Sequence, residues 1–475
     1  MSSKLLEEIS GWSIEAKDED TEKYFFHFDD VSQIENGTKN YVIGRKGTGK
    51  TAISEYIHGQ KEYDQFSRML SFKNFPFNAL YDLADDDYTR PNQYITIWKY
   101  VIYHYICSMM GDNEKVASRC DFDLKSAFGF EVQGALSRSV KNITSKEYNL
   151  SFLGVGGGYA NSSGESKFDF VVANSVLLDF IKDKIDESEY YLMFDELDED
   201  YRDVLNPDRR DKYFELLISL FKAVQSIRAE LKKYNVRPII FLRDDIFDLC
   251  RDNDKNKWLD RAVMLKWDEA QLRKLVNYRL AVAAEMSGVD HDPQAAWFTA
   301  FSVDQTRWGH RSRADDTFKY LLSRTFLRPR DVISYIRECA AVAESRGHSR
   351  IGNDAIKDGL DAHSGYMRRE IIDEAFPVLD EISEILNVIS RMRKIIFTKK
   401  EFSDRFREYQ NSLPKDQRTR LSESQILRIL YHFNVIGNTV TGGHRVFAYN
   451  SDVKVLDLER PLCVHNGLLK TLKII

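Results

Sequence analysis

The feature that most constrains this chain is a glycine-rich octet, residues 44–51, with the sequence GRKGTGKT. The apolar run Tyr41-Val42-Ile43 precedes it, and a helical pattern follows to about Ile57. The spacing matches GxxxxGK followed by Ser or Thr, in which glycines let the backbone curl so that several N–H groups point at one anion. A strand, this loop and a helix N-terminus together predict a phosphate-binding loop, with Lys50 at the outer phosphates and the Thr51 hydroxyl on Mg²⁺.

A second apolar run, Tyr190 to Phe194, leads directly into Asp195 and Glu196. A buried strand that ends in this way would place both carboxylates at the same sheet edge as the phosphate loop. We therefore expect Asp195 to hold Mg²⁺ through water and Glu196 to polarise the attacking water. The alternative interpretation is an acidic loop that merely caps a strand.

A third apolar run, Pro238 to Leu242, ends at Arg243. A guanidinium at the end of the next buried strand would be placed to report whether a terminal phosphate is present. The alternative is a surface Arg paired with Asp244 or Asp245.

Apolar runs that alternate with helical patterns predict an α/β fold with a parallel sheet of the P-loop NTPase kind, and we expect a helical domain and a C-terminal winged-helix domain after it; the resemblance described below implies that the helical domain is a lid. The low content of 24 Gly and 9 Pro also favours a helix-rich chain. We expect residues 1–266 to form the P-loop core, with a lead-in at 1–38 packed on it and an inserted hairpin within 112–170. Helical periodicity from 268 to 356 predicts a helical domain at 267–362. A long helix at about 371–393 would then link to a winged-helix module, the two together spanning 363–475.

The order of phosphate loop, acidic strand and Arg-ended strand resembles the additional-strand P-loop ATPases, which include the AAA+, origin-recognition-like and STAND proteins. This resemblance implies ATP and Mg²⁺ as ligands. Lys257-Trp258-Leu259-Asp260-Arg261 stands where AAA+ proteins often carry an arginine finger, so the resemblance implies that Arg261 reaches a neighbour's nucleotide in a homo-oligomer. Leu327-Arg328-Pro329-Arg330 is similar to the start of a lid helix with a second sensor, which Arg330 would be.

The polar Asn or Thr of a AAA+ first sensor is absent before Arg243, and the 112–170 insert has no counterpart in the pattern. A GTPase is a rival interpretation, but residues 256–260 miss the NKxD guanine motif by one residue, so ATP is preferred. The residues expected at the nucleotide, besides the acids, Arg243 and Arg261, are Gly44, Gly47, Thr48, Gly49, Lys50, Thr51, Ala52 and Arg330.

The C-terminal segment differs in charge from the rest. Residues 391–475 hold 16 Lys or Arg and 8 Asp or Glu, a net +8, whereas the whole chain carries −6, so residues 1–390 carry −14. Helical patterns at 400–409 and 422–433 followed by a strand pair at 435–449 give the order of a winged helix-turn-helix. Gln425 and Arg428 would lie on the exposed face of its second helix, and His444 and Arg445 on the wing, as contacts to double-stranded DNA. Docking on a protein is the alternative.

The five cysteines are scattered without CxxC spacing, which predicts neither a zinc site nor a disulfide framework. The N-terminus lacks the apolar core of a signal peptide, so we expect a cytoplasmic protein that does not engage a membrane. The favoured function is a Mg²⁺-dependent ATPase switch that controls assembly or partner engagement. Two alternatives are a DNA-binding initiator or regulator, and an ATP-dependent scaffold of a bacterial defence system that activates an effector protein.

Overall fold

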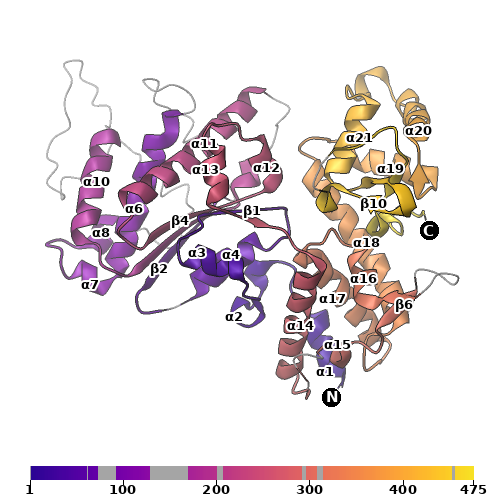
Figure 1. The fold of residues 1–475 in the computed structure, drawn as a ribbon, viewed down its shortest axis with the longest axis horizontal. Helices are drawn as coiled ribbons and strands as arrows, with labels where there is room; N and C mark the ends of the chain where they lie inside the picture. Colours follow the sequence, from indigo (N-terminus) through magenta and orange to yellow (C-terminus); the bar gives the residue numbers. More distant parts are fainter. Residues whose placement is uncertain are drawn as a thin grey trace. The chain divides into compact units, whose positions relative to one another are not determined.

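The computed structural model describes residues 2–60, 62–72, 92–128, 170–200, 207–290, 292, 296–307, 314–451 and 455–474. The chain forms two compact units (Figure 1). The core unit is His27–Lys266, and the helical unit combines Met1–Phe26 with Trp267–Ile475. Among the described residues, no helix has both the length and the apolarity needed to cross a bilayer.

A five-stranded parallel sheet organises the core unit, in the order β2-β3-β4-β1-β5. Its strands are β1 (Tyr41–Gly44), β2 (Gln65–Ser71), β3 (Glu189–Asp195), β4 (Val236–Leu242) and β5 (Ala262–Leu265). β1, β3 and β4 are buried almost throughout, as their unbroken apolar runs require of central parallel strands. Because all strands run the same way, their carboxyl ends meet at one edge. The predicted α/β class with a parallel P-loop sheet is confirmed.

Helices cover both faces of this sheet. Figure 1 shows α3 (Asp29–Glu35) and α4 (Lys50–Gly59) on one face and the large helices α6 and α11 on the other. The remaining described helices are α6 (Ile95–Asp112), α7 (Glu114–Ala117), α8 (Leu124–Phe128), α10 (Phe170–Lys184), α11 (Pro207–Glu230), α12 (Asp244–Leu249) and α13 (Lys255–Asp260). The hairpin expected within 112–170 falls mainly outside the described residues, whose part of that segment forms α7 and α8.

The N-terminal lead-in differs from its expected place. Residues 1–26 pack on the helical unit, because the apolar stripe of α1 (Ser2–Ser10) joins the core formed around α14 (Glu269–Met286) and α17 (Pro329–Ser345). Arg279 of α14 fastens the segment: it is 3% exposed, forms a bidentate ion pair with Glu19, and lies over the rings of Trp12 and Tyr24 at 4.8 and 4.7 Å. Burying a guanidinium requires such a partner.

In the part of 268–356 that the structure describes, an antiparallel strand pair, β6 (Gln305–Arg307) with β7 (Ala314–Asp316), interrupts the expected run of helices. Its residue Thr306 is buried and hydrogen-bonds Thr317 and Asn353, which fixes the hairpin to the flanking helices. The other elements here are η1 (Ala16–Asp18), α2 (Thr21–Tyr24), α15 (Ala296–Ala300), α16 (Thr317–Leu322) and α18 (Asn353–Ala375).

The long helix expected at 371–393 is two helices, α18 and α19 (Ile382–Met392). α18 ends just before Pro377, which lacks an N–H group and clashes with the preceding turn. The expected boundary at residue 363 also falls inside α18.

Residues 382–474 form what we call the C-terminal module. Helices α20 (Lys399–Ser412) and α21 (Glu423–His432) are followed by β9 (Ile436–Thr439) and β10 (Arg445–Val446), in the expected order. Two short strands that the sequence did not indicate, β8 (Ile396–Phe397) and β11 (Leu462–Val464), complete a four-stranded sheet ordered β10-β9-β11-β8. The apolar core of the module also includes residues of α18, such as Met367 and Ile371.

Candidate nucleotide site

The loop between β1 and α4 is curled by its glycines. Gly47 and Gly49 have φ angles of +78° and +98°, in the left-handed region that L side chains rarely adopt. Gly44 is restricted by space instead: a Cβ there would lie 2.6 Å from Thr48 Oγ1 and 2.9 Å from Leu265 Cβ. The loop leads directly into the N-terminus of α4, whose first N–H groups have no partner within the helix. This backbone fits an anion such as a phosphate chain.

Lys50 lies folded over this loop. Its Nζ donates to the carbonyl oxygens of Gly44 at 2.9 Å and Arg45 at 3.0 Å. Burial lowers the pKa of Lys50, and the nearby carboxylates of Asp198 and Asp195 act in the opposite direction. An anion bound in the loop would favour the charged ammonium further.

Asp195 ends β3 and is 3% exposed. The Ser54 hydroxyl lies 3.1 Å from its Oδ2, the backbone N–H of Glu196 donates to its Oδ1 at 2.9 Å, and the Thr51 side chain also hydrogen-bonds it. Burial raises the pKa of Asp195, whereas these hydrogen bonds and Lys50 lower it. The structure thus brings the Thr51 hydroxyl and the Asp195 carboxylate together, an oxygen pair that suits Mg²⁺.

Glu196 follows with a φ of +59°, which is strained for a residue with a side chain. Its carboxylate accepts a hydrogen bond from the hydroxyl of Ser71, the last residue of β2. Sequence reasoning missed Ser71, although parallel pairing sets it directly opposite Asp195. The sequence signal that could have found Ser71 is its position as a polar residue at the end of β2, the strand that pairs with β3.

Arg243 caps the amino end of α12, and its side chain is 11% exposed. It forms a bidentate pair with Asp245, at 3.0 Å from Nε and 2.7 Å from Nη2, and its Nη1 lies 3.4 Å from Asp198 Oδ2. The pairing with Asp245 matches the alternative interpretation, but the residue is largely buried rather than on the open surface. Arg243 lies at the carboxyl edge of the sheet, as β4 ends at Leu242.

Arg261 does not join this group. It is exposed directly before β5, and the pairing of Tyr41 with Ala262 sets it at the amino edge of the sheet, opposite the phosphate loop. Its Nη1 donates to the Thr38 carbonyl at 3.2 Å. Within its own subunit it is therefore turned away from the site.

Arg330 belongs to the helical unit, near the start of α17, where it pairs with Glu15 at 2.9 Å and Glu370 at 3.7 Å. Its neighbour Arg328 is 1% exposed and is held by Asp331 and Glu374, so Arg328 stabilises the start of α17.

The residues expected to contact DNA have different surroundings. Arg428 is exposed on α21 as predicted. Gln425 is also exposed, but its side-chain oxygen accepts from Ser422 in a capping box that begins α21. Arg445 donates to Asn466 at 2.5 Å and is half-buried, whereas His444 is exposed. Gln425 and Arg445 therefore have structural contacts that DNA contact would have to replace.

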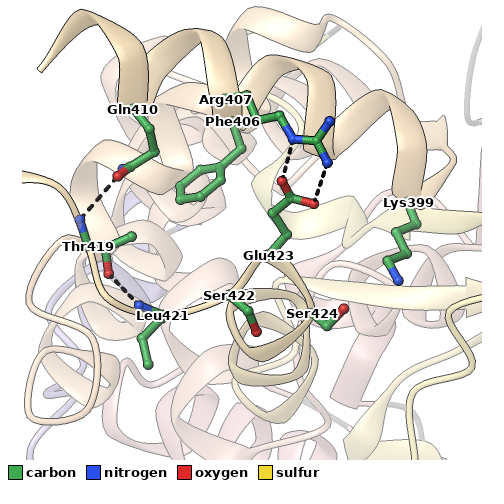
Figure 2. A pocket seen from close by; sticks show the side chains of 9 residues that line it. All are labelled: Lys399, Phe406, Arg407, Gln410, Thr419, Leu421, Ser422, Glu423 and Ser424. Atoms are coloured by element: carbon green, nitrogen blue, oxygen red, sulfur yellow. Dashed lines mark hydrogen bonds and ion pairs between the residues drawn. The ribbon is translucent and has the colours of Figure 1, made fainter.

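A groove of about 370 Å³ lies beside the N-terminus of α21, and Figure 2 shows the side chains that line it. Phe406 of α20 points into it, and Arg407 crosses to Glu423 with an Nε–Oε1 distance of 2.8 Å (Figure 2). This ion pair neutralises two of the three charged residues that line the groove, and Lys399 leaves the lining with one net positive charge.

Comparisons with known proteins match parts of this description. A family model described as the FunZ-associated C-terminal helical domain matches residues 270–372 of the helical unit. An 80.3 kDa protein of transposon gamma-delta from Escherichia coli (strain K12) is 27% identical over 342 residues. That match covers 66% of this chain and 44% of the relative, so the chain spans less than half of the relative's length.

Solved structures with a similar layout include a Walker-type ATPase of Pyrococcus abyssi, with a TM-score of 0.41, 11% identity and coverage of 95% of this chain and 96% of that one. The Aeropyrum pernix ORC1 protein in complex with DNA has a TM-score of 0.35 at 11% identity, covering 93% and 90%. At these scores the fold assignment depends on the strand order described above rather than on the likeness.

Proposed function

We propose that this chain binds ATP with Mg²⁺ and hydrolyses it, as a switch that controls assembly or engagement of a partner. The observation that carries the proposal is the meeting of three groups at one sheet edge: Lys50 on its curled loop, the Thr51–Asp195 oxygen pair, and Glu196. Each supplies a part that phosphoryl transfer needs: an anion cradle, a cation site and a base for water.

In this proposal the loop N–H groups and Lys50 bind the phosphates, because the curled loop and the start of α4 supply N–H donors and Lys50 lies beside them. Thr51 and Asp195 hold Mg²⁺, which when bound neutralises charge on the outer phosphates. Glu196 accepts the proton of the attacking water once its carboxylate leaves the Ser71 hydroxyl. Arg243 detects the terminal phosphate from the end of β4.

Two further arginines would act between parts of an assembly. Arg261, exposed at the amino edge of the sheet, is available to a neighbouring subunit's nucleotide, which makes a homo-oligomer the active form. Arg330 would contact the nucleotide from the lid after release from Glu15 and Glu370.

The test is ATP affinity by calorimetry for Lys50→Ala, with Lys46→Ala as a control because it removes the same side chain from the same loop. Losing a hydrogen bond from a charged group costs about 1.5–3 kcal/mol, so Lys50→Ala should bind at least about ten-fold more weakly. Lys46→Ala should bind near the wild-type level. Unchanged affinity in Lys50→Ala would refute the site.

A second candidate function is binding of double-stranded DNA by the C-terminal module as a winged helix. It is favoured by the net +8 of residues 391–475 together with exposed Arg428 on α21. Phosphate contacts would make the affinity fall steeply with salt.

DNA binding is tested on the full chain, because the module shares its apolar core with α18 and a fragment from residue 391 would lack part of it. Arg428→Glu should weaken DNA binding and flatten its salt dependence. Lys357→Glu, exposed on α18, makes the same charge change away from the module and should have little effect. No DNA binding by the wild type at low salt would leave docking on a protein as the better account of this surface.

A further inference from the structure

Among the described residues, the carboxylates of Asp245 and Asp198 contact Arg243 from the segments that follow β4 and β3. Asp245, two residues further along the chain, makes the bidentate pair at 2.7 and 3.0 Å, and Asp198 reaches Nη1 from η4 (Leu197–Asp200), the turn after β3. The Arg243 and Asp245 side chains are 11% and 17% exposed, so water screens this pair weakly. Asp198 is the more exposed and more distant partner, at 33% and 3.4 Å. Asp245 therefore orients Arg243, whereas Asp198 is the partner that is easier to displace.

Lys50 is the second cation of the site, and its Nζ lies on the carbonyl oxygens of Gly44 and Arg45. Lys50 and Arg243 come from different elements, one at the start of α4 and one directly after β4, and Asp198 contacts Arg243. In P-loop chemistry the group that lies between two such cations is the terminal phosphate of the nucleotide.

We propose that Asp198 is a positioning residue that occupies the place of an anion beside Arg243 until a terminal phosphate displaces it, while Asp245 keeps Arg243 oriented. This inference rests on the proposed ATP site and deepens it. A nucleoside triphosphate must compete with the Asp198 carboxylate, but a diphosphate does not extend as far. Asp198 thus sets the preference of the site between ATP and ADP, and it gives η4 a position that depends on which nucleotide is bound.

The experiment measures ATP and ADP affinities by calorimetry in EDTA, which keeps Mg²⁺ and hydrolysis out of the comparison. Asp198→Asn should bind ATP about five-fold or more tightly than the wild type, with ADP affinity nearly unchanged. Asp248→Asn removes the same charge from the exposed side of α12 and should change neither affinity. Retained ADP affinity shows that each variant is folded.

The Arg243→Ala background tests whether Asp198 acts through Arg243, which a purely structural role of Asp198 would not require. In that background the gain from Asp198→Asn should shrink to about two-fold or less, because the two residues act through one contact. Asp245→Asn should lower the ATP-to-ADP affinity ratio. Equal shifts in ATP and ADP affinity, or an undiminished gain without Arg243, would overturn the inference while ATP binding and its loss in Lys50→Ala still stand. A wild-type chain that binds no ATP would overturn the proposed function as well.

Discussion

Three glycines around the β1–α4 connection should respond differently to the same substitution by alanine. Gly44→Ala adds a methyl group to space that other atoms occupy, and Gly49→Ala adds one where the backbone φ is unfavourable for a side chain. Gly59→Ala adds a methyl group to open space, with no unfavourable φ. The three changes are chemically identical and lie within sixteen residues of one another. Their different outcomes therefore test the loop geometry itself.

The expected magnitudes follow from what each new Cβ meets. At Gly44 the neighbours yield little, since Thr48 Oγ1 donates to the Arg45 carbonyl at 2.8 Å and Leu265 is in the strand paired with Gly44. Overpacking of this kind costs about 1–3 kcal/mol. At Gly49 nothing lies within 4 Å, but a φ of +98° costs an L residue about 1–2 kcal/mol. Gly59 ends α4 with open space, so alanine should stabilise by about 0.4–1 kcal/mol.

Native-state hydrogen exchange of the β1 and α4 amides is the suitable assay, because the chain has two units and global unfolding need not be two-state. ATP affinity is measured on the same proteins. Gly44→Ala and Gly49→Ala should lower both the local opening free energy and the ATP affinity. Gly59→Ala should raise the local opening free energy and leave the ATP affinity unchanged. If all three variants behave alike, the geometric reasoning about the loop is wrong.

Three other predictions concern catalysis, assembly and pH. Glu196→Gln should keep ATP bound but slow turnover by about 10²-fold or more in a phosphate-release assay, and a wild-type rate would move the base elsewhere. Arg261→Ala should lose ATPase activity at protein concentrations where the wild type is oligomeric by light scattering; unchanged activity in a strictly monomeric protein would contradict the finger role. Burial lowers the pKa of His363 to about 4, so the unfolded state binds more protons and stability should fall as pH drops from about 6.5 to 4. His363→Phe retains an aromatic ring against Tyr335, and it should weaken the pH dependence of the unfolding free energy measured by denaturant titration at several pH values. An unchanged pH dependence in this variant would mean that another group takes up the protons.

Local sequence patterns were sufficient to predict those site residues whose positions depend on a single segment of the chain. The phosphate loop, the end of β3 and the end of β4 are each specified by an apolar run and the polar residues directly after it. Buried parallel strands need no partner information to be recognised, since both of their faces are apolar. The positions of Lys50, Asp195 and Arg243 at the carboxyl edge of the sheet could therefore be predicted from three such segments.

Pairwise contacts between distant segments were not predictable in this way. Ser71 reaches Glu196 only because β2 pairs with β3, and Glu19 reaches Arg279 only because the N-terminal segment folds onto α14. Gln425 is a different case. Its spacing from Ser422 is that of a capping box, which already indicates that its side chain is used inside the helix N-terminus.

The N-terminal segment has a consequence for how this protein can be divided. Because residues 1–26 belong with 267–475, the core unit is an insertion within the helical unit, and a fragment starting at Trp267 would be incomplete. Such a fragment would expose the surface that Leu6 and Trp12 cover and leave Arg279 buried without its carboxylate. A synthetic peptide of residues 2–26 should therefore bind the fragment and restore its solubility. A fragment cut to the residues that the family model matches, 270–372, would lack residues 1–26, which pack in the same unit.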